Sequence, residues 1–97
     1  MQAQATRALG NLALTSDEKL ATQMVSEGVL ELLVLLAASW AEAVQEEAAI
    51  ALSNFAEWPR FRLRIIKAGA VTALLEQIKS TSPAVQYHGA LALVALQ

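Results

Sequence analysis

The sequence predicts an all-α protein, a right-handed α-solenoid of stacked helical units. Three observations predict this fold. Apolar residues recur at helical spacing along the whole chain, as in Leu52, Phe55 and Ala56. Residues typical of helix ends divide the chain into short segments. Similar segments return at a period of about 41–43 residues, within the ~40–47 of helical solenoids.

Composition narrows the class of protein before any motif is considered. The 97 residues are 56% hydrophobic and 16% charged, which suits one domain or a piece of one and excludes a disordered tail. The net charge of −2 argues against nucleic acid as a partner. There is no cysteine, and His88 is the single histidine, so thiolate sites and multi-histidine sites are excluded. We therefore expect no metal, no cofactor and no catalytic residue.

Membrane insertion and export are not predicted either. The N-terminus lacks a basic region followed by an apolar stretch and a cleavage site. The most apolar segment, residues 28–38, is about half the ~20 residues of a spanning helix, and Glu31 interrupts it. We expect an intracellular protein, cytoplasmic or nuclear.

The helical spacing predicts seven helices, over residues 2–14, 16–27, 29–38, 42–57, 59–68, 70–79 and 83–97. Residues typical of helix ends stand between them: Thr15 with Glu18, Ser39 with Glu42, Gly28, Gly69, Pro59, and Ser82 with Pro83. Thr15, Ser39 and Ser82 are the expected N-caps. Gly28 and Gly69 are expected to stop helices in the left-handed conformation.

The repeat relates the predicted helices over residues 2–14, 42–57 and 83–97, each of which is the third helix of a repeated unit. Residues 44–56 align with the segment 85–93 at an offset of 41, and with Gln2–Ala13 at an offset of 43. The segments Ala8-Leu9-Gly10-Asn11-Leu12-Ala13 and Ala51-Leu52-Ser53-Asn54-Phe55-Ala56, with the glycines that follow Glu27 and Ala68, resemble armadillo repeats. The resemblance implies a third helix of a preceding repeat over 1–15 and two repeats over 16–57 and 59–97. It also implies a segment of a longer armadillo protein.

The resemblance implies a groove lined by the third helices, which holds an extended partner segment. Asn11 and Asn54 match the asparagine that hydrogen-bonds a partner's backbone, whereas the third equivalent is Ala95. An amide suits this role because it both donates and accepts. The alternative is an asparagine that satisfies free carbonyls near a helix C-terminus.

The remaining groove positions favour a catenin-like surface over an importin-α-like one. Where importin-α carries tryptophan, this chain has Arg7, Ile50 and Leu91. One turn earlier lie Gln4, Glu47 and His88. The candidate peptide-binding groove is therefore Arg7, Asn11, Glu47, Ile50, Asn54 and His88.

Other polar and aromatic residues are given ordinary surface or packing roles. Arg60, Arg64 and Lys67 share one helix face, interpreted as solvated, with Leu63 and Ile66 expected to point inward. The glutamates at 42, 46 and 47 are expected to be solvated, or to interact with a helix N-terminus. Both tryptophans, at 40 and 58, are expected to pack at corners rather than to bind a ligand.

Two functions follow from these observations. The first is a protein–protein interaction scaffold without enzymatic activity, which binds an extended peptide in the groove. The alternative is a structural segment that self-associates, as a homodimer or larger, by stacking its uncapped apolar ends or by exchanging a terminal helix. An enzyme would need an acid–base pair in a pocket, and the sequence offers scattered carboxylates and one histidine.

Overall fold

A computed structural model describes residues 2–13 and 17–97, and every regular element in these residues is an α-helix. The seven helices are α1 (Ala3–Ala13), α2 (Glu18–Ser26), α3 (Val29–Ala37), α4 (Glu42–Ala56), α5 (Pro59–Lys67), α6 (Ala70–Gln77) and α7 (Pro83–Ala95). The predicted all-α fold is confirmed. The helix limits differ from prediction by at most two residues, and the predicted ends at 14 and 16 lie outside the described residues.

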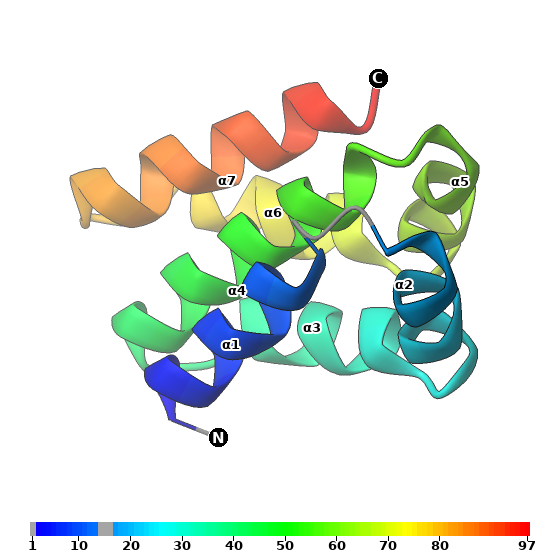
Figure 1. Cartoon of the computed structure of the whole chain (residues 1–97). Coiled ribbons are helices and arrows are strands. Elements are labelled where there is room, and N and C mark those ends of the chain that lie inside the picture. Colours follow the sequence, from blue (N-terminus) through cyan, green and yellow to red (C-terminus); the bar gives the residue numbers. More distant parts are fainter. Residues whose placement is uncertain (1, 14–16) are drawn as a thin grey trace.

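The helices form layers around α4. Helices α1, α4 and α7 lie side by side, with α4 between the other two (Figure 1). Helices α3 and α6 pack together behind them, and α2 and α5 stand at one end of the molecule (Figure 1). The third helices of the predicted repeats are therefore neighbours, as a solenoid requires.

Local sequence accounts for most helix ends. Gly28 and Gly69 have φ of 91° and 95°, the left-handed conformation expected of them. Ser82 caps α7, its hydroxyl accepting from the Val85 N–H, as predicted. Thr15 lies outside the described residues, and Asp17 is the N-cap of α2.

The predicted cap at Ser39 is wrong. Ala41 is the N-cap of α4 and makes no side-chain cap bond. The Ser39 hydroxyl instead accepts from the Ala41 N–H at 3.2 Å, and the Gln45 amide donates to the Ser39 carbonyl. Ser39 thus orders the connection between α3 and α4 rather than the first turn of α4.

The core lies where α3, α4, α5 and α6 meet. Its largest fully buried side chains include Phe55, Leu30, Leu33, Leu52, Ile65 and Leu74. In α5 the expected inward face is wrong, because Leu63 is 61% exposed and Ile66 39%. Phe61 and Ile65 are buried instead, and Phe61 packs edge-on against Phe55 with ring centroids 6.4 Å apart.

The two tryptophans differ. Trp58 is half-buried and packs against Phe61, as expected. Trp40 is 94% exposed, so the prediction that it packs at a corner is wrong. Trp40 stands in the short connection between α3 and α4, where its side chain is exposed to solvent.

Among the described residues no single helix is long and apolar enough to cross a membrane. Helices α2 and α3 meet the criterion only when joined, and they are bent by 71° at the break between them. Residues of both helices, Val25 and Leu30 among them, pack in the core.

Candidate functional site

The candidate groove residues all lie on the three adjacent helices α1, α4 and α7. Arg7 and Asn11 are exposed on α1, and His88 is half-buried on α7. On α4, Ile50 and Asn54 are half-buried and Glu47 is buried. The fold therefore brings the residues of three distant sequence segments to neighbouring helices.

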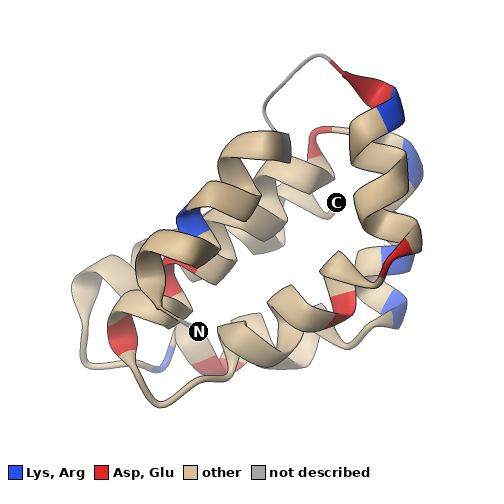
Figure 2. Cartoon of the chain, turned by 60° about the horizontal axis from the view of Figure 1, so that its bottom comes forward, with Lys and Arg blue, Asp and Glu red and all other residues tan. Residues whose placement is uncertain are grey.

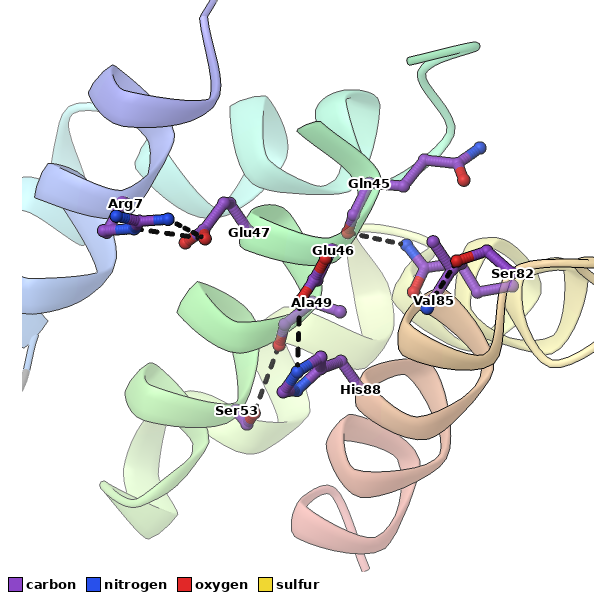
Figure 3. A network of polar contacts seen from close by, with 10 residues as sticks. Arg7, Gln45, Glu46, Glu47, Ala49, Ser53, Ser82, Val85 and His88 are labelled. Atoms are coloured by element: carbon purple, nitrogen blue, oxygen red, sulfur yellow. Dashed lines mark hydrogen bonds and ion pairs between the residues drawn. The ribbon is translucent and has the colours of Figure 1, made fainter. Parts of the chain in front are cut away.

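Arg7 and Glu47 form an ion pair between α1 and α4. The Arg7 Nε and Nη2 atoms donate to the same Glu47 oxygen, Oε1, at 3.1 and 2.9 Å (Figure 3). The hydrogen bond and the charge of Glu47 raise the pKa of Arg7 above its usual value. Glu47 is only 8% exposed, so the expectation that this carboxylate is solvated is wrong. The ion pair was not predicted, because Arg7 lies 40 positions before Glu47 in the chain.

Glu46 makes the matching contact on the other side of α4. Its Oε1 lies 3.4 Å from His88 Nε2 on α7, which is an ion pair when the imidazole is protonated (Figure 3). His88 was predicted to lie in the groove, whereas Glu46 was not. Adjacent glutamates thus connect α4 to both neighbouring third helices.

Asn54 uses part of its amide within the fold. Its Nδ2 donates to the Gly10 carbonyl of α1 at 3.0 Å. This is the alternative considered from the sequence, an asparagine that satisfies a carbonyl near a helix C-terminus. Among the described residues its Oδ1 has no hydrogen-bond donor.

Gln77 is a polar connection that sequence reasoning missed. It is 3% exposed at the end of α6, and its Nε2 donates to the carbonyls of Ala37 and Gln45 at 2.9 and 3.1 Å. One of these carbonyls belongs to the last residue of α3, which has no helical partner of its own. The Oε1 of Gln77 is buried without a hydrogen bond in the part of the chain described.

Two of the three cations on the basic face of α5, Arg60 and Arg64, contact carboxylates of neighbouring helices. Arg60 lies 2.9 Å from Glu18 and also donates to the Thr22 hydroxyl, and Arg64 lies 3.8 Å from Glu31. Figure 2 shows the acidic and basic segments close together at the end of the molecule formed by α2 and α5. These exposed pairs connect successive units and leave less positive charge for an acidic partner.

Enclosed sites suited to chemistry do not appear in the described residues. No group of three or more histidine, aspartate or glutamate side chains gathers there in a metal-binding arrangement. A hollow of about 680 Å³ lies between α3 and α6 and is lined by apolar residues such as Val34, Ala38 and Ala73 together with polar ones such as Gln45, Glu76 and Lys79. None of the candidate groove residues lines it.

Comparison with known proteins supports the fold. An engineered protein from a structural genomics consortium superimposes with a TM-score of 0.90 and 35% identity, over 98% of this chain and 39% of its own. A second engineered protein from the same consortium gives a TM-score of 0.87 and 36% identity, over 97% of this chain and 23% of its own. A designed armadillo repeat protein gives a TM-score of 0.84 and 29% identity, over 98% of this chain and 40% of its own. No protein-family model and no curated protein matches the sequence.

The chain is therefore an armadillo-like repeat solenoid, which confirms the armadillo-like fold expected from the sequence. The catenin-like character of the groove stays a prediction. It spans two fifths or less of the length of the solved structures that it resembles. Solenoids of this kind are in general protein-binding scaffolds, because their stacked helices present extended surfaces.

Proposed function

We propose that the chain is a binding scaffold without catalytic activity and that it holds an extended segment of a partner protein across α1, α4 and α7. The observation that carries the proposal is the pair Asn11 and Asn54. They lie 43 positions apart on neighbouring third helices, one exposed and one half-buried. Neither side-chain oxygen has a hydrogen-bond donor among the described residues, so both are available to a backbone N–H.

The spacing of the helices suits an extended ligand. Packed helices have axes ~8–10 Å apart, and an extended chain rises ~3.3 Å per residue. Asparagines on neighbouring helices would therefore meet every second or third residue of a bound segment. One turn before Asn11 on α1, Arg7 keeps 61% of its side chain exposed while paired with Glu47, which leaves a cation beside the asparagine.

Affinity is expected to be low. Two asparagine contacts at ~0.5–1.5 kcal/mol per hydrogen bond give a few kcal/mol, whereas micromolar binding needs ~8 kcal/mol. Millimolar binding of a short peptide is the expected outcome. The exposed Arg7 favours a segment that carries an acidic residue near the backbone contact.

The test is an NMR titration with eight-residue peptides that carry either Asp or Lys at a central position. Shifts confined to α1, α4 and α7, larger for the Asp peptide, are expected. Asn54→Ala and Asn11→Ala should weaken binding several-fold, whereas Gln23→Ala, which removes an exposed amide from α2, should leave it unchanged. Equal peptide affinity in the original chain and in all three variants would show that the asparagines do not contribute to binding.

A further inference from the structure

The hollow between α3 and α6 has an apolar wall that is open to water. The α3 side contributes Val34, Leu35 and Ala38, the residue that ends the helix. Leu35 is 72% exposed although it lines the hollow, so the protein itself does not fill this space. The volume of about 680 Å³ lies within the ~300–1,000 Å³ of clefts that take drug-sized ligands, and it is therefore large enough for an aromatic side chain.

An exposed tryptophan stands beside this hollow. Trp40 follows Ala38 by two positions and is 94% exposed. Its backbone is held on both sides, because the Ser39 hydroxyl accepts from the Ala41 N–H at 3.2 Å and the Gln45 side chain donates to the Ser39 carbonyl. A rigid indole on an ordered connection loses little conformational freedom when it binds.

The repeat shows that Leu35 and Trp40 do not serve the stacking of units. Shifted by the offset of 41, these two positions become Glu76 and Thr81 in the following unit. The Glu76 side chain is 70% exposed, and Thr81 is exposed as well. Stacking of one unit on the next therefore tolerates polar, solvated residues at both positions, and the apolar pair needs another explanation.

The exposure of this pair does not depend on where the sequence begins or ends. A following unit is already in place, with α6 packed on α3, and Leu35 and Trp40 remain 72% and 94% exposed. Glu76 and Thr81 belong to a unit that already has another before it, and they too are exposed. A further unit before α2 would therefore leave Leu35 and Trp40 accessible.

We propose that two copies of this chain form a two-fold dimer in which the Trp40 indole of each copy enters the α3–α6 hollow of the other. The projecting indole and the hollow lie next to one another on the same chain, so one two-fold rotation makes both contacts at once. Such a contact is isologous and closes at the dimer. The inference is independent of the peptide-binding proposal, because no candidate groove residue lines the hollow.

Charges around the hollow favour a second copy as the occupant. Lys79 lines the hollow, and Glu42 is exposed in the first turn of α4, two positions after Trp40. When the indole of one copy enters the hollow, Glu42 of that copy approaches the rim that carries Lys79 of the other. Lys79 keeps 72% of its side chain exposed while it lies 3.4 Å from Glu76, so it is accessible to a second carboxylate. The dimer should therefore weaken as NaCl screens this contact.

The proposed interface is small, and the dimer is expected to be weak. A tryptophan side chain buries ~150–250 Å², so two indoles with the walls that they cover stay below the ~1,200 Å² that marks weak and transient complexes. We expect a dissociation constant on the order of 10⁻⁴ M. Sedimentation velocity and NMR diffusion up to about 1 mM should show monomer and dimer and nothing larger. Over the same range the fluorescence emission should shift to shorter wavelength, because Trp40 leaves water, and this shift should be absent in Trp40→Phe.

Substitutions test both halves of the contact. Trp40→Ala removes the indole, and Leu35→Glu gives the apolar wall the residue that the following unit carries at this position. Each should raise the dissociation constant at least tenfold. Glu42→Gln should weaken the dimer several-fold and reduce its dependence on NaCl. Leu63→Glu is the matched control, because Leu63 is 61% exposed on α5 and does not line the hollow, and it should leave the dissociation constant unchanged.

A mixture of two variants distinguishes an indole in the hollow from a direct contact between two indoles. Trp40→Ala retains an intact hollow, whereas Leu35→Glu retains an intact indole. With ¹⁵N-labelled Trp40→Ala and unlabelled Leu35→Glu at about 1 mM each, we expect chemical-shift changes at hollow residues such as Ala38 and Ala73 of the labelled chain. A contact between two indoles predicts no change in this mixture.

Several outcomes would overturn the proposal. They are a monomer at 1 mM, association that survives Trp40→Ala or Leu35→Glu, and a mixture without shifts at the hollow. Loss of association in Leu63→Glu would indicate nonspecific apolar contact and would also overturn it. If Leu35→Glu does not fold by circular dichroism, Ala38→Lys replaces it with the same expected results, because Ala38 is exposed and its repeat equivalent is Lys79.

Discussion

A methyl group added at Gly10 tests how closely α1 packs on α4. Gly10 is buried, and a Cβ built on it would lie 2.9 Å from the Ala51 Cβ and 3.0 Å from the Ala51 Cα. Carbon atoms pack at ~3.5–4.0 Å, so Gly10→Ala requires a shift of roughly 0.6–1 Å between the helices. The nearest atoms belong to a short side chain and to backbone, which cannot rotate away.

Two opposing effects decide the sign of the change. Alanine in a helix is favoured over glycine by ~0.8–1.0 kcal/mol, whereas overpacking a fitted contact costs ~1–3 kcal/mol. The shift would also lengthen the bond from Asn54 Nδ2 to the Gly10 carbonyl, now 3.0 Å. We expect a net loss of about 1–2 kcal/mol in the free energy of unfolding, which lowers Tm by roughly 5–15 °C in a domain of this size.

The assay is a double-mutant cycle measured by thermal and urea unfolding. Ala51→Gly removes the nearest carbon and should partly restore the stability of Gly10→Ala, although the Ala51 Cα remains close. A favourable coupling energy of about 1 kcal/mol is expected between the two sites. A Gly10→Ala protein that is as stable as the original, or more stable, would refute the close packing of α1 on Ala51.

Two further predictions concern single positions. Gly28→Ala should lower the free energy of unfolding by ~1–2 kcal/mol in urea titrations, because φ is 91° and no atom lies near enough to clash; Gly28→Asn should cost less. Unchanged stability in the Gly28→Ala protein would contradict the left-handed turn. Trp40→Phe should alter stability by less than ~0.5 kcal/mol and shift the fluorescence emission to shorter wavelength, because half-buried Trp58 remains the sole indole. An emission maximum that remains at its original long wavelength would indicate that Trp40 is not the solvated tryptophan.

The seven helices could be predicted from the sequence because their signals are local. Gly28 and Gly69 end segments at positions where a left-handed residue is required, and Ser82 before Pro83 is a cap recognisable within four residues. The recurrence of Asn11 at Asn54 then predicted the stacking of α1 on α4, since residues of one period occupy equivalent places.

The orientation of individual helices was harder to predict. Helix α3 is apolar on nearly every side, so its spacing does not show that Leu33 faces the core while Leu35 faces solvent. In α5 the aromatic packing of Phe61 on Phe55 determined the buried side and left Leu63 outside. In both helices the neighbouring unit decides which apolar side chains are covered.

The positions of the candidate groove residues on neighbouring helices were predicted from the sequence, but their contacts were not. The groove residues do lie on adjacent third helices, but the burial of Glu47 depends on Arg7, and the role of Asn54 depends on the Gly10 carbonyl. The contacts of Gln77 could not be predicted from the sequence, because its partners are backbone carbonyls of two other helices.

The sequence by itself determined the helices, their ends and the period at which they repeat, since each depends on residues within a few turns of one another. Tertiary structure alone decided which carboxylate is buried and which tryptophan is solvated. The burial of Glu47 depends on Arg7, 40 positions away, and such a pair has no definite distance until the helices have stacked.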